Sequence, residues 1–248
     1  MLRKNELAEI AKLNNLRIWQ QEKHYVQSLV LIALSGVQVV FKGGTYLWFF
    51  HGLNRFSEDL DFTWLNEVPE SVEETVSKTL GMFGVENKIK KITNDERTYS
   101  FRVSAAGPLN TSERDMCHVY VEISKREKIS RKPVALAFEI PAYSLPVKII
   151  SGMSLDEVAA EKIRAIISRD KARDLYDLHF LLVRTNASLD LELTADKLKY
   201  YGIKFSKELL RRKIREKEQH WKAELSQLIF GELPEFGSVE NRVLEVLG

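Results

Sequence analysis

Residues 36–64 have the pattern of a strand, a turn, a helix and a second strand, and this pattern limits the possible folds of the chain. Residues 37–41 are apolar except for Gln38 and predict a buried strand. Four residues with the composition of a tight turn follow: Lys42, Gly43, Gly44 and Thr45. A short helix is expected next, and then a second strand that begins at Asp59. This alternation of strands and helix predicts an α/β fold.

Two carboxylates stand on the second strand. Asp59 and Asp61 alternate with Leu60 and Phe62. Because successive side chains of a strand point to opposite faces, we expect both carboxylates on one face and the apolar pair in the core. Carboxylates on one face repel each other, and a raised pKa or a bound cation relieves the repulsion. Hard oxygen ligands suit Mg²⁺ or Mn²⁺. A solvated strand edge would give the same pattern.

The glycine turn favours the metal-site interpretation. Gly43 and Gly44 let backbone N–H groups approach an anion closely, and the helix that follows directs the positive end of its dipole at that anion. A phosphate-binding turn followed by a pair of carboxylates predicts a nucleotide site.

A third acid is expected on a later strand. In residues 118–124 the apolar side chains alternate with polar ones, and this places Glu122 on the polar face, where it could join Asp59 and Asp61. Glu139 has the same local pattern and is the second choice. A surface glutamate explains either position equally well.

The chain changes character after residue 150. Residues 1–150 are expected to form an α/β core with N-terminal helices and a mixed sheet of five or six strands, and residues 151–248 a helical region that completes the cleft. The expected strands are 37–41, one from residue 59, 85–93, 98–105, 118–124 and 134–140. Helices are expected at 68–83 and, among others, as one long helix at 206–229.

Three charged residues of the helical region are candidate site residues. Lys162 lies on or beside the apolar stripe of a helix that opens with a Ser154–Glu157 capping box, and such a lysine either extends to solvent or points into a cleft. Asp174 and Asp177 are neighbours on the next helix. Their spacing alone fits an acidic helix start with an arginine salt bridge.

Composition and charge exclude some classes of protein. A single cysteine excludes an internal disulfide and any multi-cysteine metal site, and fits a cytoplasmic protein. No stretch predicts a signal peptide or a transmembrane helix, so no membrane partner is expected. Net charge is only +2, but residues 197–222 hold ten basic residues against three acidic ones. That segment, with Tyr200 and Trp221, is a candidate RNA-facing surface, although a solvated helix face is the commoner cause of a charge run.

The first block resembles the polymerase-beta-like nucleotidyltransferase superfamily, in which a Gly-Gly or Gly-Ser turn precedes Asp-x-Asp on the next strand. The fuller string resembles the AbiEii/AbiGii toxin family, which includes the MenT nucleotidyltransferase toxins. It combines Lys42-Gly43-Gly44-Thr45, then Arg55, Ser57, Asp59 and Asp61, then Glu161-Lys162-x-x-Ala165, and finally Arg173-Asp174-x-x-Asp177-Leu178.

This resemblance implies transfer of a nucleoside monophosphate from an NTP to an acceptor, with release of pyrophosphate. Metal binding is expected of Asp59, Asp61 and Glu122, and catalytic roles of these three with Lys162 and Asp174. Nucleotide contacts are expected from Lys42, Gly43, Gly44, Thr45, Arg55, Ser57 and Asp177. By resemblance the acceptor is the 3′ end of tRNA and the protein is a toxin with a cognate antitoxin. A protein or small-molecule acceptor, or an NTP-binding module without transferase activity, is the alternative.

Overall fold

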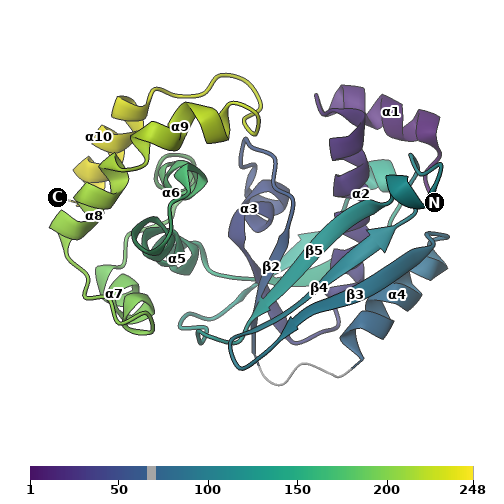
Figure 1. The fold of residues 1–248 in the computed structure, drawn as a ribbon, viewed down its shortest axis with the longest axis horizontal. Coiled ribbons are helices and arrows are strands. Elements are labelled where there is room, and N and C mark those ends of the chain that lie inside the picture. Colours follow the sequence, from purple (N-terminus) through teal and green to yellow (C-terminus); the bar gives the residue numbers. More distant parts are fainter. Residues whose placement is uncertain (66–70, 248) are drawn as a thin grey trace. The chain divides into compact units, whose positions relative to one another are not determined.

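A computed structural model describes residues 1–65 and 71–247 and shows an α/β protein (Figure 1). The described residues contain ten α-helices and one seven-stranded mixed sheet, which confirms the predicted fold class. The chain divides into two compact units. The first comprises Met1–Tyr46, Glu58–Ile129 and Pro133–Gly152, and the second comprises Leu47–Ser57, Ser130–Lys132 and Met153–Gly248.

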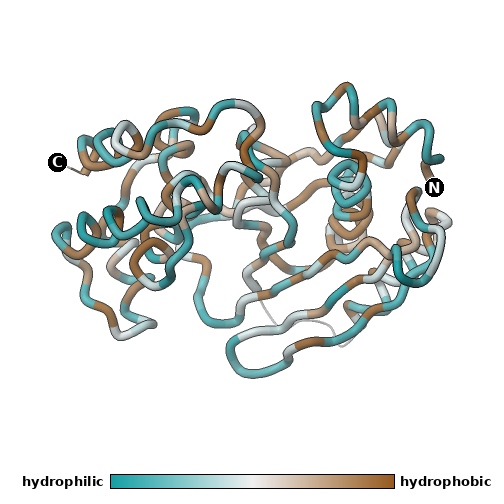
Figure 2. Tube along the Cα trace, turned by 45° about the horizontal axis from the view of Figure 1, so that its top comes forward, coloured by the Kyte–Doolittle hydropathy of each residue, from teal (hydrophilic) through white to brown (hydrophobic). Residues whose placement is uncertain are grey.

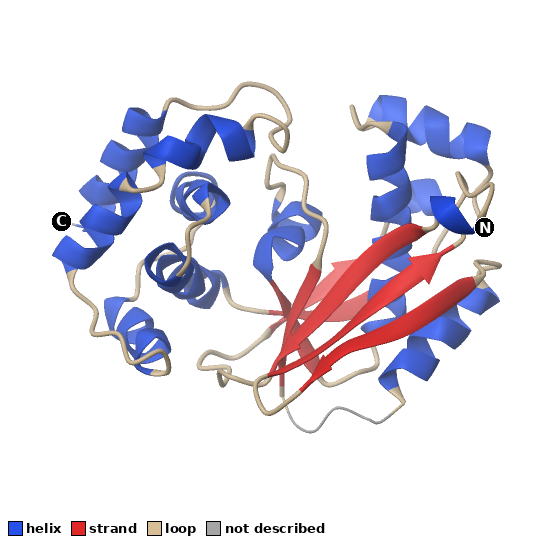
Figure 3. Ribbon diagram, in the orientation of Figure 1, coloured by secondary structure: helices blue, strands red, loops and turns tan. Residues whose placement is uncertain are grey.

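The sheet belongs to the first unit (Figure 3). Its strands are β1 Val39–Lys42, β2 Leu60–Trp64, β3 Asn87–Asn94, β4 Thr98–Ala105, β5 Cys117–Ser124, β6 Val134–Phe138 and β7 Lys148–Gly152. Their order is β3-β4-β5-β2-β1-β7-β6. β2 pairs in parallel with β5 and β1 in parallel with β7, whereas the remaining neighbours are antiparallel. The two strands that carry the predicted acids, β2 and β5, are therefore direct neighbours.

Strand β7 was not expected from the sequence. It has only five residues, and its exposed Lys148 and Ile149 precede the buried Ile150, so it lacks a clear alternation of apolar and polar side chains. Its place in the sheet depends on pairing with β6 and, through Gly152, with Phe41 of β1. Such a long-range pairing leaves no local signal.

Helices α1 Lys4–Leu13, α2 Ile18–Leu34 and α4 Val72–Met82 also belong to the first unit. α2 packs against β5 and α4, and α4 packs against β3. The C-terminal half of α2 is buried. It is also hydrophobic, as the hydropathy colouring of Figure 2 illustrates. α2 and α4 thus lie against the sheet, and the sheet residues Phe62 and Val121 are buried. The start of the helix predicted at 68–83 falls on residues 68–70, which lie outside the described residues.

The second unit is built from helices. They are α5 Leu155–Ser168, α6 Ala172–Arg184, α7 Leu191–Lys199, α8 Lys207–Arg215, α9 Glu218–Leu225 and α10 Phe236–Leu247. Helix α3, Gly43–His51, runs from the first unit into the second. Among the described helices, none combines the length and the hydropathy that a membrane span requires.

The prediction of one helix at 206–229 was wrong. The chain breaks between α8 and α9 at Glu216 and Lys217. The break buries the Lys217 side chain, whose Nζ donates to the Arg169 carbonyl at 2.7 Å and contacts Asp170 Oδ1 at 3.0 Å. In the sequence, Lys217 is one of many charged residues of this segment, and nothing there indicates that its partners are Arg169 and Asp170.

Candidate active site

Helix α3 begins directly at Gly43, so the predicted turn is shorter than expected and Lys42 is the last residue of β1. Gly43 has φ +80°, a backbone conformation that side-chain-bearing residues rarely adopt. A Cβ added at this position would collide with the carboxylate Oδ2 of Asp61 and lie 3.0 Å from its Cβ. Glycine is therefore required by both conformation and space, and the start of α3 lies directly against the Asp61 carboxylate.

Strand register aligns three charged residues on one face of the sheet. Asp61 of β2 is the partner of Lys42 on β1 and of Glu122 on β5. Because register partners on neighbouring strands share a face, these side chains form one row across β1, β2 and β5. Lys42 is buried, whereas Asp61 and Glu122 are half-buried. Alternation along the two strands predicted that Asp61 and Glu122 would be able to meet.

Local hydrogen bonds hold the remaining parts of this site. The Thr45 hydroxyl donates to the Asp59 carbonyl at 2.5 Å, which ties the exposed Asp59, just before β2, to the first turn of α3. Arg126 Nη2 donates to Glu122 Oε1 at 2.8 Å. The contact of Thr45 gives it a positioning role, because its hydroxyl is directed at the backbone of an acid.

The alternative third acid occupies a different place. Glu139 directly follows β6, one of the two edge strands, and β1 and β7 stand between β6 and β2 in the sheet. Glu122 is on the strand next to β2. This topology favours Glu122 over Glu139.

The chemistry of these side chains suits a magnesium ion that is held partly by substrate. The described residues contain no group of three or more His, Cys, Asp or Glu side chains arranged to hold a metal ion. Mg²⁺ with nucleotide substrates is usually bound through one or two carboxylates together with phosphate oxygens, and a preformed cage of protein ligands is not needed. The aligned carboxylates of Asp61 and Glu122, beside the glycine at position 43, match that requirement.

Gly43→Ala is expected to lower nucleotidyl transfer strongly and to destabilise the protein by about 1–3 kcal/mol, because the new Cβ meets Asp61 at a strained φ. Steady-state kinetics and thermal unfolding measure the two effects. Gly36→Ala is the matched control, because nothing lies within 4 Å of the added Cβ. Equal activity of the Gly43→Ala protein and the wild type would contradict this description of the turn.

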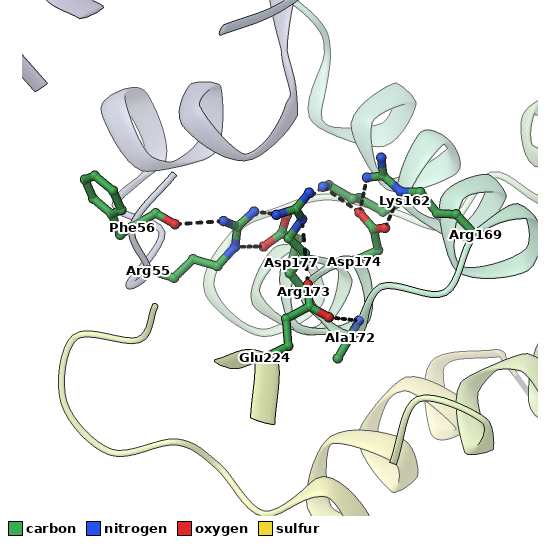
Figure 4. A network of polar contacts seen from close by, with 9 residues as sticks. All are labelled: Arg55, Phe56, Lys162, Arg169, Ala172, Arg173, Asp174, Asp177 and Glu224. Carbon is green, nitrogen blue, oxygen red and sulfur yellow. Dashed lines mark hydrogen bonds and ion pairs between the residues drawn. The ribbon is translucent and has the colours of Figure 1, made fainter. Parts of the chain in front are cut away.

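The second unit contains a cluster of ion pairs around two fully buried carboxylates (Figure 4). Lys162 Nζ of α5 contacts Asp174 Oδ1 at 3.1 Å and Asp177 Oδ2 at 2.6 Å. Arg55 holds Asp177 with two hydrogen bonds, from Nε at 2.6 Å and from Nη2 at 2.7 Å. Arg169 holds Asp174 in the same two-point manner, at 2.7 and 2.8 Å. Three cations thus share two carboxylates.

This arrangement decides the question that the sequence left open about Lys162. Its side chain is only 8% exposed, so it does not extend to solvent, and both of its partners on α6 are fully buried. Asp174 and Asp177 are not simply acidic residues at a helix start. Asp174 pairs with Lys162 and Arg169, and Asp177 pairs with Lys162 and Arg55. Fork-like Arg–carboxylate pairs of this kind fix orientation as well as charge.

Electrostatics keep both aspartates ionised. Burial raises the pKa of Asp174, but the Lys162 ammonium and the Arg169 guanidinium together lower that pKa by more than burial raises it. The pKa of Asp174 is therefore below the usual range. Burial likewise raises the pKa of Asp177, and Arg55 and Lys162 reverse the effect, so that this pKa is also lowered. For Arg55, burial lowers the pKa and Asp177 more than compensates. The folded cluster therefore contains charged partners.

These lowered pKa values predict acid sensitivity. A carboxyl whose folded pKa lies below its unfolded value contributes stability that is complete above the unfolded pKa and is lost as pH falls toward the folded one. The unfolded value of an aspartate is about 3.9, so the free energy of unfolding should fall progressively below about pH 5. Chemical denaturation at several pH values measures this slope. Asp174→Asn should flatten it, and an unchanged slope in that variant would contradict the assignment.

Two predicted nucleotide-contact residues lie in the second unit with this cluster. Arg55 is 4% exposed, and its Nη1 donates to the Phe56 carbonyl at 2.9 Å in addition to the bonds with Asp177. This geometry favours a positioning role for Arg55 over direct contact with phosphate. Ser57 is half-buried and ends the segment that Arg55 anchors to α6.

Sequence reasoning missed Arg169 and Glu224. Arg169 lies at the C-terminal end of α5, five residues before Asp174, and this short connection was its only sequence signal. Glu224 of α9 accepts a hydrogen bond from the Ala172 backbone N–H at 2.7 Å and lies 3.8 Å from Arg173 Nε, and thereby links α9 to the start of α6. Nothing near Glu224 in the sequence marks it as a partner of α6.

The capping box predicted at the start of α5 is only half present. Ser154 Oγ accepts from the Glu157 N–H. The Glu157 carboxylate is fully buried and instead accepts from the backbone N–H groups of Ser130 and Arg131, both at 2.9 Å, and from Lys197 Nζ at 2.6 Å. Glu157 therefore joins three segments of the second unit.

The predicted RNA-facing surface at residues 197–222 needs correction. Lys197 is buried and contacts Glu157 and, at 3.4 Å, Glu161, and Lys217 is buried at the helix break. Trp221 is 2% exposed, and its indole N–H donates to the Pro234 carbonyl. These three side chains stabilise the second unit, so they are not available to an RNA on the surface.

Comparison with known proteins identifies the family. The model of the nucleotidyl transferase AbiEii toxin family, of type IV toxin–antitoxin systems, matches residues 30–242. No curated protein matches the chain. Two similar solved structures are MenT4, a nucleotidyltransferase toxin of Mycobacterium tuberculosis H37Rv, and JHP933 of Helicobacter pylori.

Both structures share the fold across most of their length. MenT4 has 22% identity and a TM-score of 0.67, with 99% of this chain and 88% of MenT4 covered. JHP933 has 21% identity and a TM-score of 0.62, with 92% of this chain and 89% of JHP933 covered. The family match confirms the resemblance predicted from the motifs, and it implies an NTP as substrate and an antitoxin as partner. The chain belongs to the AbiEii family of nucleotidyltransferase toxins of type IV toxin–antitoxin systems.

Proposed function

We propose that this protein transfers a nucleoside monophosphate from an NTP to the 3′ end of tRNA in the cytoplasm, in a reaction that depends on Mg²⁺ or Mn²⁺. The observation that carries the proposal is the row formed by Lys42, Asp61 and Glu122, with Gly43 against the Asp61 carboxylate. It combines a turn able to receive phosphate with carboxylates able to hold a cation.

Each residue of the row has a proposed task. Gly43 and Gly44 offer backbone N–H groups at the start of α3 to the triphosphate, and Lys42 adds positive charge to the row. Asp59, Asp61 and Glu122 would hold the metal, which when bound neutralises triphosphate charge and orients the reacting oxygens. Thr45 keeps the backbone of Asp59 in place through its hydroxyl.

The reaction balances without a further reactant. The oxygen of the 3′-terminal hydroxyl of the acceptor forms a bond to the α-phosphorus of the NTP. The bond from that phosphorus to the bridging oxygen of the β-phosphate breaks, and pyrophosphate leaves with the electron pair. Glu122, whose carboxylate Arg126 orients, would either hold the metal or accept the hydroxyl proton. Where Glu122 holds the metal, the proton passes to water.

Residues of the second unit surround Lys162. Asp174 and Asp177 hold its ammonium from two sides, and Arg55 and Arg169 fix those carboxylates in turn. We propose a positioning role for this cluster within the second unit, because a Lys162 ammonium that is 8% exposed and held by two buried carboxylates is not open to a phosphate.

Incubation of the purified protein with total tRNA, Mg²⁺ and each α-labelled NTP in turn tests the proposal. Label is expected on RNA with wild-type protein and is expected to be absent after chelation of the metal or in the Asp59→Ala/Asp61→Ala double variant. Label on a protein instead would identify protein nucleotidylation. Nucleotide binding without any transfer would identify a binding module and overturn the proposal.

A further inference from the structure

The face of the sheet that carries Asp61 and Glu122 continues as a polar surface over β5, β4 and β3. A second row runs beside the carboxylates: Tyr120 of β5 is the register partner of Arg102 on β4, and Arg102 is the partner of Lys90 on β3. Tyr120 lies two positions before Glu122 on the same strand and therefore on the same face. When the pairing of Leu60 with Val121 is extended by one residue, Tyr120 comes beside Asp59.

Tyr120 and Arg102 have environments that are unusual within a sheet. Tyr120 is 45% exposed although it lies on β5, near the middle of the sheet. Lys90 is exposed on β3, the edge strand. The Nε atom of Arg102 is buried and has no hydrogen-bond partner within the described part of the chain. The row thus presents an open aromatic ring next to two cations and within reach of the acidic row.

We infer that the row of Lys90, Arg102 and Tyr120 binds the single-stranded 3′-terminal segment of the RNA acceptor. Tyr120 would stack on a terminal base, and Lys90 and Arg102 would contact the phosphates that precede it. This inference rests on the proposed function, since it assigns the acceptor of the same site.

The geometry distinguishes this acceptor from the NTP. Gly43 and the start of α3 meet Asp61 from the side of β1, whereas the second row lies on the side of β5. Donor phosphates and acceptor would therefore approach the carboxylates from opposite sides. In-line phosphoryl transfer requires the attacking and leaving oxygens to be on opposite sides of the phosphorus.

The charge of the row matches its proposed ligand. A phosphate chain is attracted by cations on β3 and β4 and repelled by the carboxylates on β2, so it would end where the carboxylates begin. Tyr120 lies between the cations on β3 and β4 and the carboxylates on β2. A base stacked on Tyr120 would leave the terminal hydroxyl beside Glu122.

Kinetics of Tyr120→Ala test the inference, with the NTP and the RNA acceptor varied separately. KM for the acceptor is expected to rise roughly 5- to 150-fold, the range found when a stacking aromatic is replaced by alanine, while KM for the NTP stays within about twofold. Tyr120→Phe keeps the ring and should restore acceptor KM. A rise in KM for the NTP alone would place the donor base on Tyr120 and overturn the inference.

Two further variants keep the test decisive. Tyr200→Ala removes a tyrosine of nearly equal exposure, 47%, from the basic segment 197–222, so a larger rise in acceptor KM here than in Tyr120→Ala would overturn the inference. Lys90→Gln with Arg102→Gln should reduce the slope of log KM against log salt by about 1.4, since each contact to single-stranded phosphate contributes about 0.7. An unchanged slope would also contradict it. Failure of the wild type to label any RNA would instead refute the proposed function.

Discussion

Asp61→Asn is expected to lower the rate of nucleotidyl transfer by roughly 10³-fold while the protein remains folded. The metal that Asp61 would hold stabilises transition-state charge by several kcal/mol, and each 1.36 kcal/mol corresponds to about a factor of ten in rate. Asp61 is only half-buried, and asparagine has nearly the same shape as aspartate. The substitution therefore preserves the packing of this side chain against Gly43. Single-turnover kinetics and the thermal midpoint measure activity and folding independently.

The two glutamates provide the comparison for this experiment. Glu122→Gln should lower the rate of transfer by at least about 10²-fold, because a metal ligand or proton acceptor is removed. Glu139→Gln should have little effect, because two strands separate β6, which Glu139 follows, from β2. Full activity of Asp61→Asn would remove the basis of the proposed site. A large loss in Glu139→Gln with none in Glu122→Gln would move the third acid to β6.

Asp177→Ala is expected to destabilise the protein by about 3–5 kcal/mol, which corresponds to a fall of roughly 6–20 °C in the thermal midpoint. Asp177 is fully buried, and its loss leaves Arg55 without its carboxylate and Lys162 with Asp174 alone. Removing one partner of a buried ion pair costs more than the pair itself contributes, since the remaining charge is no longer compensated. Calorimetry or circular dichroism during heating measures the shift.

Asp196→Ala is the matched control for this variant. Asp196 pairs with Lys199 at 2.6 Å, but both side chains are mainly exposed, so their pair should contribute less than about 1 kcal/mol. A shift of the same size in both variants, or none in Asp177→Ala, would contradict the interpretation that the buried cluster stabilises the second unit.

The first half of the site could be predicted because its signals are local. Alternation along β2 and β5 places Asp61 and Glu122 on polar faces, and the glycine pair marks the start of α3. A side chain on a strand has only two possible faces, so the sequence itself limits where an acid can point. The sequence ranked Glu122 before Glu139 as the third acid, and the strand order, which the sequence did not reveal, adds support for Glu122.

Partners across long distances could not be predicted. The sequence shows Lys162, Lys197 and Lys217 as three similar lysines, yet each is buried with different partners. Whether a lysine reaches solvent or a carboxylate depends on segments far along the chain, such as Glu157 for Lys197. Strand β7 was missed for a related reason, because it is stabilised by pairing with β1 and β6 and not by its own pattern.

Labelling of tRNA that has been oxidised with periodate, beside untreated tRNA, tests whether the acceptor group is the 3′-terminal hydroxyl of tRNA. Oxidation destroys the 3′-terminal diol and leaves the rest of the RNA intact. With the active α-labelled NTP and Mg²⁺, the wild type should label untreated tRNA and leave oxidised tRNA unlabelled, and the Asp61→Asn variant should label neither. Equal label on oxidised tRNA, or label only on protein, would contradict transfer to the 3′ end of tRNA.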